Sequence, residues 1–342
     1  MQHACRGCRG RGKRASSCRS FPRFLRPIRF SVAQVRHRLE LLGAALLFST
    51  GGAAVKATTL NGWQVASFRS GLAALMVWVV MREARRGWTW HVLPAGAAYA
   101  GAMILYVTAN KLTTAANAIF LQATAPLYVL VLSPLLLREK IRARDLGFMA
   151  VVAVGMLLFF VERSPAAATA PDPRTGNLLA AASGVCWAAT IMAFRWLGSR
   201  PGSDGNTFPS VVAGNLIAFL TCLPLALPAR PTGVDVAAVG YLGVFQIGAA
   251  YLLLATGIRH VPAVEASTLL LLEPALNPFW AWLVHGERPG AWSLAGGALI
   301  LGSTLAKTVV DGRRKDGAEV RGAEVRRCGS PPIEGRPSDL DR

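Results

Sequence analysis

Long stretches of the chain contain no Asp, Glu, Lys or Arg, and they recur at short intervals between residues 40 and 309. An apolar helix needs roughly twenty residues to cross the hydrocarbon core of a bilayer. The pattern predicts ten membrane-spanning helices, near 40–57, 63–81, 91–109, 114–137, 144–161, 176–195, 208–227, 236–257, 263–284 and 290–309. Because these helices use most of the chain, no room remains for a soluble catalytic domain. We therefore expect an all-α integral membrane protein.

The composition agrees with this fold class. Of 342 residues, 53% are hydrophobic and 16% are charged, whereas a soluble domain carries about a quarter charged residues. The net charge of +19 arises largely in the tails, since residues 1–39 hold eleven basic side chains and no acidic one. We therefore expect no nucleic-acid-binding domain. Residues 1–38 are predicted to form a disordered cytoplasmic tail beside anionic lipid.

The sequence predicts no metal site, no cofactor and no enzyme activity. Cys5 and Cys8 form one half of a zinc-ribbon pattern, and no second half lies nearby. The segment 7–13 is similar to a phosphate-binding loop, but Arg14 stands where Ser or Thr is needed, so ATP is not expected to drive a reaction. The five histidines are scattered and form no catalytic motif.

Two halves of the chain repeat each other. At an offset of 148, Pro126 falls on Pro274 and Glu139 on Glu287. A second offset, of 139, places the first predicted span on the sixth. The repeat predicts five-helix units at 39–161 and 175–309, an external linker at 162–174 and a charged cytoplasmic tail at 310–342.

A unit that follows five spans enters the membrane with the opposite orientation, so we expect an inverted repeat. The charges support this, because residues 138–144 hold four basic side chains and the corresponding residues 286–292 hold one. Cytoplasmic loops favour Lys and Arg, which places the first loop inside and its counterpart outside. We expect a multi-pass protein of the inner (plasma) membrane with both termini in the cytoplasm.

The segment from Leu272 to Glu287 joins a Glu-Pro pair to a final Gly-Glu, and it resembles the EamA-type family of the drug/metabolite transporter (DMT) superfamily. A first copy runs from Ala123 to Gly155, with Ala125-Pro126 in place of Glu-Pro. The resemblance covers nearly all of residues 39–309. It implies a ten-helix transporter that moves small metabolites, often outward; its relatives carry amino acids, nucleosides, sugars and other solutes.

Glu273 is the clearest candidate for a functional side chain. It lies about midway along the ninth predicted span, where a charge is costly, and Pro274 and Pro278 weaken the backbone hydrogen bonds beside it. One interpretation is that Glu273 binds an amine of the substrate or couples transport to protons. The alternative is a structural carboxyl that is protonated or paired with arginine.

Two basic residues flank the first predicted external turn. Arg69 and Lys56 could each bind a substrate carboxylate. The structural alternatives are an ion pair between Arg69 and Glu273, which we favour, and a Lys56 side chain that reaches the lipid headgroups. Glu265 is predicted to sit at a helix start, and Glu287 to cap the turn before the last helix.

Uncharged polar and aromatic residues complete the candidate site. The amides are Asn110, Asn117, Gln122, Asn215, Gln246 and Asn277, of which Gln246 and Asn277 are the better candidates because they lie in the middle of spans. Hydrogen bonds between helices are the structural alternative for each. The aromatic candidates are Tyr106, Trp187, Tyr251 and Trp280. Glycines 147, 155, 296, 297 and 302 are predicted to allow close packing of two peripheral helices.

The expected function is secondary transport of small polar metabolites such as amino acids or related compounds, in the outward direction and by alternating access between the two repeats. The alternatives are a membrane scaffold or receptor without flux, and a facilitator of nucleosides, sugars or drugs. Expected partners are a small-molecule substrate and the lipid bilayer; proton coupling and a homodimer stay open.

Overall fold

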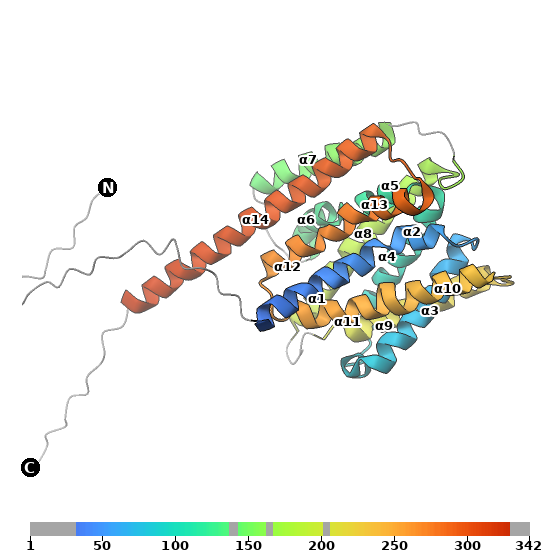
Figure 1. Ribbon diagram of the computed structural model, residues 1–342. Helices are drawn as coiled ribbons and strands as arrows, with labels where there is room; N and C mark the ends of the chain where they lie inside the picture. The colour runs from blue at the N-terminus through green and yellow to red at the C-terminus, as the bar shows by residue number, and fades with distance from the viewer. Residues whose placement is uncertain (1–31, 137–142, 162–166, 201–205, 329–342) are drawn as a thin grey trace, which may run out of the picture.

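The computed structural model describes residues 32–136, 143–161, 167–200 and 206–328, and helices dominate all four ranges (Figure 1). The helices are α1 (Val32–Ser49), α2 (Gly51–Lys56), α3 (Gly62–Val80), η2 (Arg82–Arg85), α4 (Val92–Leu112), α5 (Ala115–Gln122), α6 (Ala125–Leu136), α7 (Ala143–Val161), α8 (Pro173–Gly198), α9 (Phe208–Ala226), α10 (Gly233–Tyr241), η3 (Leu242–Ala249), α11 (Ala250–Gly257), α12 (Ala263–Leu270), α13 (Leu272–His285) and α14 (Ala291–Cys328). No β-strand occurs among the described residues, so the predicted all-α class is confirmed. Residues 1–31 and Glu139 lie outside them.

Eight helical stretches are long and apolar enough to cross a membrane, by length and composition. They are Val35–Lys56, Gly62–Val80, Val92–Leu112, Ala115–Leu132, Pro173–Gly198, Phe208–Ala226, Gly233–Gly257 and Ala291–Asp311. The two other predicted spans correspond to shorter helices, namely α7 and the pair α12 and α13. The described chain is therefore a multi-pass membrane protein, while the count of ten spans and the inverted repeat stay predictions.

Several helices begin and end at residues that satisfy the free backbone groups of a terminus. The Asn61 side chain accepts from the backbone N–H of Gln64, whose own side chain accepts from Asn61 N–H, which closes a capping box at the start of α3. Thr232 and Asp235 do the same at the start of α10. Gly286, with φ +66°, ends α13 in the left-handed conformation that glycine adopts at least cost.

Three of the eight apolar stretches, and the shorter apolar segment formed by α12 and α13, are interrupted along their length. A break at Thr50 separates α1 from α2, one at 123–124 separates α5 from α6, and one at Leu271 separates α12 from α13. The stretch Gly233–Gly257 contains the π-helical segment η3 between α10 and α11. Interrupted helices leave backbone groups without helical partners, and such backbone is tolerated at membrane depth only where it is buried in protein or lines a cavity. We therefore expect these interruptions to lie inside the bundle or beside a cavity.

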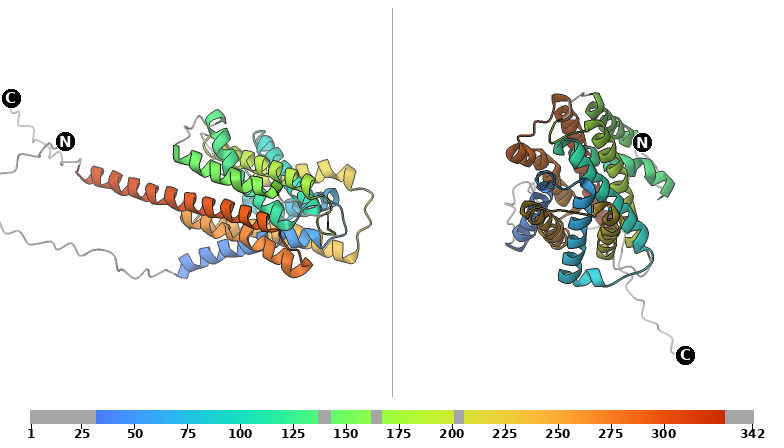
Figure 2. Two further views of the ribbon diagram at one scale, coloured as in Figure 1. Left: turned by 90° about the horizontal axis from the view of Figure 1, so that it is seen from above. Right: turned by 90° about the vertical axis from the view of Figure 1, so that its right-hand side faces the viewer.

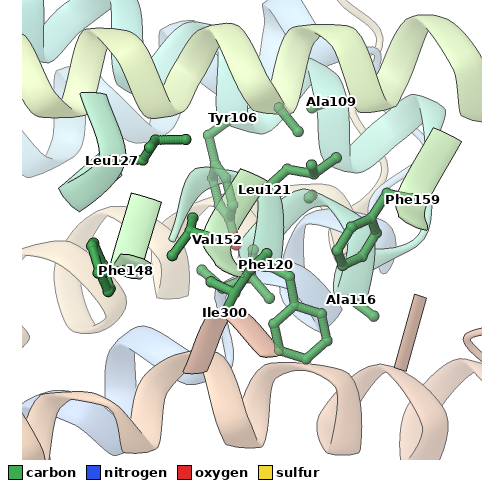
Figure 3. Packing of buried hydrophobic residues seen from close by; sticks show 13 residues of the cluster. Tyr106, Ala109, Ala116, Phe120, Leu121, Leu127, Phe148, Val152, Phe159 and Ile300 are labelled. Carbon is green, nitrogen blue, oxygen red and sulfur yellow. The ribbon is translucent and has the colours of Figure 1, made fainter. Parts of the chain in front are cut away.

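One apolar cluster connects α4, α5, α7, α8 and α14 (Figure 3). Phe120 of α5 and Phe159 of α7 lie with ring centroids 6.1 Å apart, and Ile300 of α14 packs in the same cluster. Tyr106 of α4 also belongs to it, so this tyrosine ring is fixed by packing while its hydroxyl group is free to make polar contacts.

Helices α7 and α14 pack against each other along one edge of the bundle, and α14 continues past the other helices (Figures 1 and 2). A methyl group on Gly296 would lie 2.5 Å from the Gly155 carbonyl oxygen, and one on Gly297 would lie 2.5 Å from the Phe120 ring. The prediction of close packing is confirmed for these three glycines.

The prediction of close packing is wrong for Gly147 and Gly302. No atom lies within 4 Å of a methyl group placed on either residue. Both instead line a groove of about 470 Å³ between α7 and α14. The small residues recur in a similar way along the sequence, but of the five glycines only Gly155, Gly296 and Gly297 have neighbouring atoms in close contact.

The bundle has two ends that differ in their contacts. At the α2 end, Lys111 donates to Thr58 and the Asp172 N–H donates to the Leu112 carbonyl, which brings the end of α4 to the loops before α3 and α8. At the opposite end, which we call the α12 end, Arg38 near the start of α1 pairs with Glu265 in the first turn of α12. The helix-start position predicted for Glu265 is confirmed.

Candidate functional site

Helix α3 carries Arg69 into the interior of the bundle. The residue is 1% exposed, and its Nη2 donates a hydrogen bond to Sδ of Met103 at 3.5 Å. Nε of Arg69 has no hydrogen-bond partner, and no carboxylate of the described residues forms an ion pair with it. A thioether is a weak acceptor, so this buried guanidinium keeps most of its capacity to bind an anion.

Three tyrosines face Arg69 from α4 and α11. Tyr99, Tyr106 and Tyr251 all lie close enough to the guanidinium for electrostatic interaction. The rings of Tyr99 and Tyr251 have centroids 6.3 Å apart. Tyrosine hydroxyl groups both donate and accept, so they can orient a polar ligand beside the arginine.

Glu273 lies near two of the same tyrosines. It lies in the first turn of α13, directly after the break at Leu271, and it interacts electrostatically with Tyr106 and Tyr251. Among the described residues, none donates a hydrogen bond to its carboxylate or forms an ion pair with it. The predicted ion pair between Arg69 and Glu273 is therefore not formed; the two residues share Tyr106 and Tyr251 as electrostatic neighbours.

The side chains of Gln246 and Asn277 lie against Gly51 and Gly52, the two glycines that follow the break at Thr50. A methyl group on Gly51 would be 2.8 Å from Nε2 of Gln246, and one on Gly52 would be 2.6 Å from Oδ1 of Asn277. Gln246 comes from the π-helical segment η3 and Asn277 from α13. The two glycines are needed here because only a residue without Cβ lets both amides approach the backbone of α2.

All six predicted amides have one buried atom without a hydrogen-bond partner. Five of these atoms are carbonyl oxygens and one is the Gln122 nitrogen; the residues are Asn110, Asn117, Gln122, Asn215, Gln246 and Asn277. Several of them make interhelical or local bonds through their other atoms, such as the one from Asn277 Nδ2 to the Tyr106 hydroxyl at 3.3 Å. A buried polar atom that stays unpaired costs free energy, so each of these atoms is a candidate to bind water or a polar ligand.

Further aromatic rings lie beside the tyrosines that interact with Arg69 and Glu273. The Trp187 ring of α8 lies 6.2 Å from that of Tyr99, and the Phe48 ring lies 5.4 Å from that of Tyr251. Trp280 donates from Nε1 to Oγ of Ser49 at 2.9 Å, which ties α13 to the end of α1. Trp187 therefore adjoins the tyrosine group that faces Arg69, and Trp280 fixes the helix that carries Glu273.

Two of the predicted site residues, Lys56 and Gln122, do not contact Arg69, Glu273 or the three tyrosines in the part of the chain that the structure describes. Lys56 ends α2 in an ion pair with Glu287, and no contact joins it to Arg69 or Glu273. Gln122 ends α5, and its nitrogen atom has no partner. Glu287 does not cap the turn before α14 as predicted; its Oε2 accepts from the N–H of Ala115 at the start of α5.

Tyr99 and Met103 were not predicted as site residues, although the sequence holds a signal for them. Together with Tyr106 and Asn110 they are spaced by four, three and four residues along α4, so they lie on one helical face. This face carries most of the side chains that meet Arg69. No group of three or more His, Cys, Asp or Glu residues that could hold a metal ion occurs in the part of the chain that the structure describes.

An all-helical bundle that crosses the membrane repeatedly and encloses unpaired charges and amides is the architecture of a membrane transporter. A model of the EamA-like transporter family matches residues 39–161 and 174–307, and the chain belongs to this family. The resemblance predicted from the sequence is thereby confirmed.

Similar proteins are named as transporters. The chain is 27% identical over 276 residues to the pseudopaline exporter CntI of Pseudomonas aeruginosa (strain UCBPP-PA14), a match that covers 77% of this chain and 92% of that protein. It is 22% identical over 262 residues to the uncharacterized transporter YyaM of Bacillus subtilis (strain 168), covering 72% and 84%. A crystal structure of a protein that is 21% identical matches with a TM-score of 0.55 over 82% of this chain and 99% of that chain, which supports the fold.

Proposed function

We propose that the protein is a secondary transporter, acting as an exporter, of small polar metabolites such as amino acids or related compounds. The substrate binds between Arg69 and Glu273, and the protein exposes this site alternately to the two sides of the membrane. The observation that carries the proposal is that these two charged residues form no ion pair among the described residues and share Tyr106 of α4 and Tyr251 of α11 as electrostatic neighbours.

The chemistry of the cluster favours a substrate with both signs of charge. A guanidinium binds a carboxylate through parallel N–H donors, and a carboxylate accepts from an ammonium group. The unpaired carbonyl oxygens of Gln246 and Asn277 offer further acceptors for N–H or O–H groups. Satisfying these buried groups on binding would recover the free energy that they cost while unpaired.

Alternating access rests on the repeat in the sequence. We infer ten spans in two inverted five-helix units, with the short helices α7 and α12–α13 completing the count. Both termini then lie in the cytoplasm, the α12 end faces the cytoplasm and the α2 end faces outward. The basic side chains of the loop at Arg82, Arg85 and Arg86, which lies at the cytoplasmic end in this arrangement, support the orientation.

The direction of transport is inferred from the relatives. CntI is named as an exporter of pseudopaline, and it aligns with most of this chain. Export of a related type of compound across the inner membrane is the simplest function for a protein of the same family with a charged central cluster. Glu273 is our candidate for proton coupling, because its carboxylate has no fixed partner among the described residues. A homodimer is compatible with this function and is not required by it.

A ligand screen followed by a variant tests the proposal. Purified protein in detergent is heated with amino acids, nucleosides, sugars and cationic compounds, since a ligand at one hundred times its dissociation constant stabilises the native state by about 2.7 kcal/mol. Glu273→Gln should abolish flux of the stabilising compound, or remove the pH dependence of that flux, while expression and folding stay near normal. Glu83→Gln, an exposed carboxyl in η2, is the matched control and should transport normally.

Two results would contradict the proposal. Normal, pH-dependent flux in Glu273→Gln would remove this residue from the mechanism. Stabilisation by sugars or nucleosides alone would favour a facilitator for uncharged solutes instead, because such ligands offer no charged group to Arg69 or Glu273.

A further inference from the structure

The α2 end of the bundle contains an ion pair in which both side chains are buried. Nζ of Lys56 lies 3.0 Å from Oε1 of Glu287, and the two side chains are 3% and 4% exposed. Nζ also donates to the backbone carbonyls of Thr113 at 2.8 Å and Thr169 at 2.5 Å. The ammonium group is therefore held by two hydrogen bonds to backbone carbonyls and by its charge attraction to the Glu287 carboxylate.

The partners of this pair come from both halves of the chain. Glu287 follows α13 in the second stretch matched by the family model, whereas Lys56 and Thr113 belong to the first. The other oxygen of Glu287 accepts from the N–H of Ala115 at 2.8 Å, at the positive end of α5. A single carboxylate thus holds α2 and α5 of the first half against the end of α13.

The helices α2 and α13 also hold part of the proposed substrate site. Gly52 of α2 lies against the Asn277 side chain of α13, one turn of α2 below Lys56. Between these contacts, His285 lies 2.8 Å from the Ala53 carbonyl oxygen, again joining α13 to α2. Separation of α2 from the end of α13 would open a path from the α2 end toward Asn277, and it would break the contact between Lys56 and Glu287.

The α12 end is joined differently. Arg38 and Glu265 form an ion pair there whose side chains are 25% and 34% exposed, so water reaches both groups. The described residues at this end include no ion pair buried to the degree of Lys56 and Glu287. Opening the α12 end therefore separates two partly hydrated charges, whereas opening the α2 end separates two buried charges.

We propose that Lys56 and Glu287 form a latch that closes the substrate site at the α2 end and that must break and re-form in each transport cycle. The proposal rests on the proposed function, because a latch has this role only in a protein with alternating access. When the latch opens, water replaces the lost contacts of the two charges. When it closes, the pair aligns α2, α5 and α13 around the site.

Labelling of a buried cysteine tests the latch without a known substrate. Ala116, 1% exposed and next to the residue that Glu287 caps, is replaced by cysteine in a full-length chain whose six native cysteines are alanine. The protein is placed in lipid nanodiscs and treated with a hydrophilic thiol reagent. Lys56→Met leaves an unpaired buried carboxylate, which favours the hydrated open state, so the labelling rate should rise at least about tenfold.

Two further variants keep the test decisive if Lys56→Met folds poorly. Glu287→Gln retains an oxygen for the Ala115 N–H and should also raise the labelling rate. The double variant Lys56→Met/Glu287→Gln leaves no unpaired charge and should label at a rate between those of the single variants and the parent. Glu265→Gln, which alters the ion pair at the α12 end, is the control and should leave the rate unchanged.

The outcomes separate the latch from the proposed function. Single variants that are folded and label like the parent would overturn the latch and make the pair a static bridge. Loss of flux in Glu273→Gln together with that result would leave the transporter proposal intact. Faster labelling combined with normal flux in Glu273→Gln would support the latch as a moving contact and contradict the role given to Glu273.

Discussion

The α2 end and the α12 end are both joined by an ion pair between distant parts of the sequence, but the two pairs differ in depth. Lys56 and Glu287 are almost completely buried, whereas Arg38 and Glu265 are partly in contact with solvent. Exposed pairs contribute about 0–1 kcal/mol, while removing one member of a buried pair costs about 3–5 kcal/mol. Breaking the ion pair at the α12 end therefore costs little, whereas breaking the one at the α2 end is costly.

The largest effect is expected when the buried pair is broken. Lys56→Met leaves the Glu287 carboxylate buried without its partner and should destabilise the closed α2 end by about 3–5 kcal/mol. Hydrogen–deuterium exchange of the backbone amides in the first turn of α5 measures this, because Ala115 N–H is bonded to Glu287. Unchanged exchange there would mean that solvent already reaches the pair.

A smaller effect is expected when a methyl group is added where Gly52 contacts Asn277, one turn of α2 from Lys56. Gly52→Ala places a methyl group 2.6 Å from Oδ1 of Asn277 and 2.9 Å from the Ala115 side chain. Such overpacking costs about 1–3 kcal/mol, so the melting temperature should fall and ligand binding should weaken. Gly240→Ala is the control, since no atom lies within 4 Å of its added methyl group. Equal melting temperatures for the two variants would argue against close contact between α2 and α13.

The smallest effect is expected at the α12 end. Arg38→Met removes a partly exposed ion pair and should change stability by less than about 1 kcal/mol, with no change in hydrogen exchange at the start of α5. Thermal melting and the same exchange experiment measure both quantities. A loss as large as that of Lys56→Met would remove the contrast between the two ends.

Much of the fold could be predicted from the sequence because repeated charge-free stretches of about twenty residues match the thickness of a bilayer and are rare in soluble domains. Arg69 and Glu273 stood out for a related reason, since a charged side chain inside an apolar stretch is costly and needs a role. Lys56 is likewise a charged side chain at the end of an apolar stretch, but the structure pairs it with Glu287 and not with Arg69 or Glu273. Its partner Glu287 is more than two hundred residues away, and spacing along a chain does not reveal such a contact.

The contacts of small residues were predicted less well. Gly155 and Gly147 are separated by eight residues on the same helix, yet only Gly155 packs closely against α14. The difference depends on which atoms of neighbouring helices lie opposite each glycine, which local sequence does not encode. Similarly, the break at Leu271 lies beside the prolines of α13, whereas the π-helical turn around Gln246 has no comparable sequence marker.

The contact between Lys56 and the Thr169 carbonyl gives the segment between the two halves an unexpected importance. Surface connections usually accept inserted residues at little thermodynamic cost, because loop-closure entropy grows slowly with length. Here one peptide group of the connection is itself bonded to the ammonium group that pairs with Glu287. The length of this connection therefore determines whether the Thr169 carbonyl reaches Lys56. Any chimera that joins halves from two relatives must preserve the position of Thr169 as well as the two halves themselves.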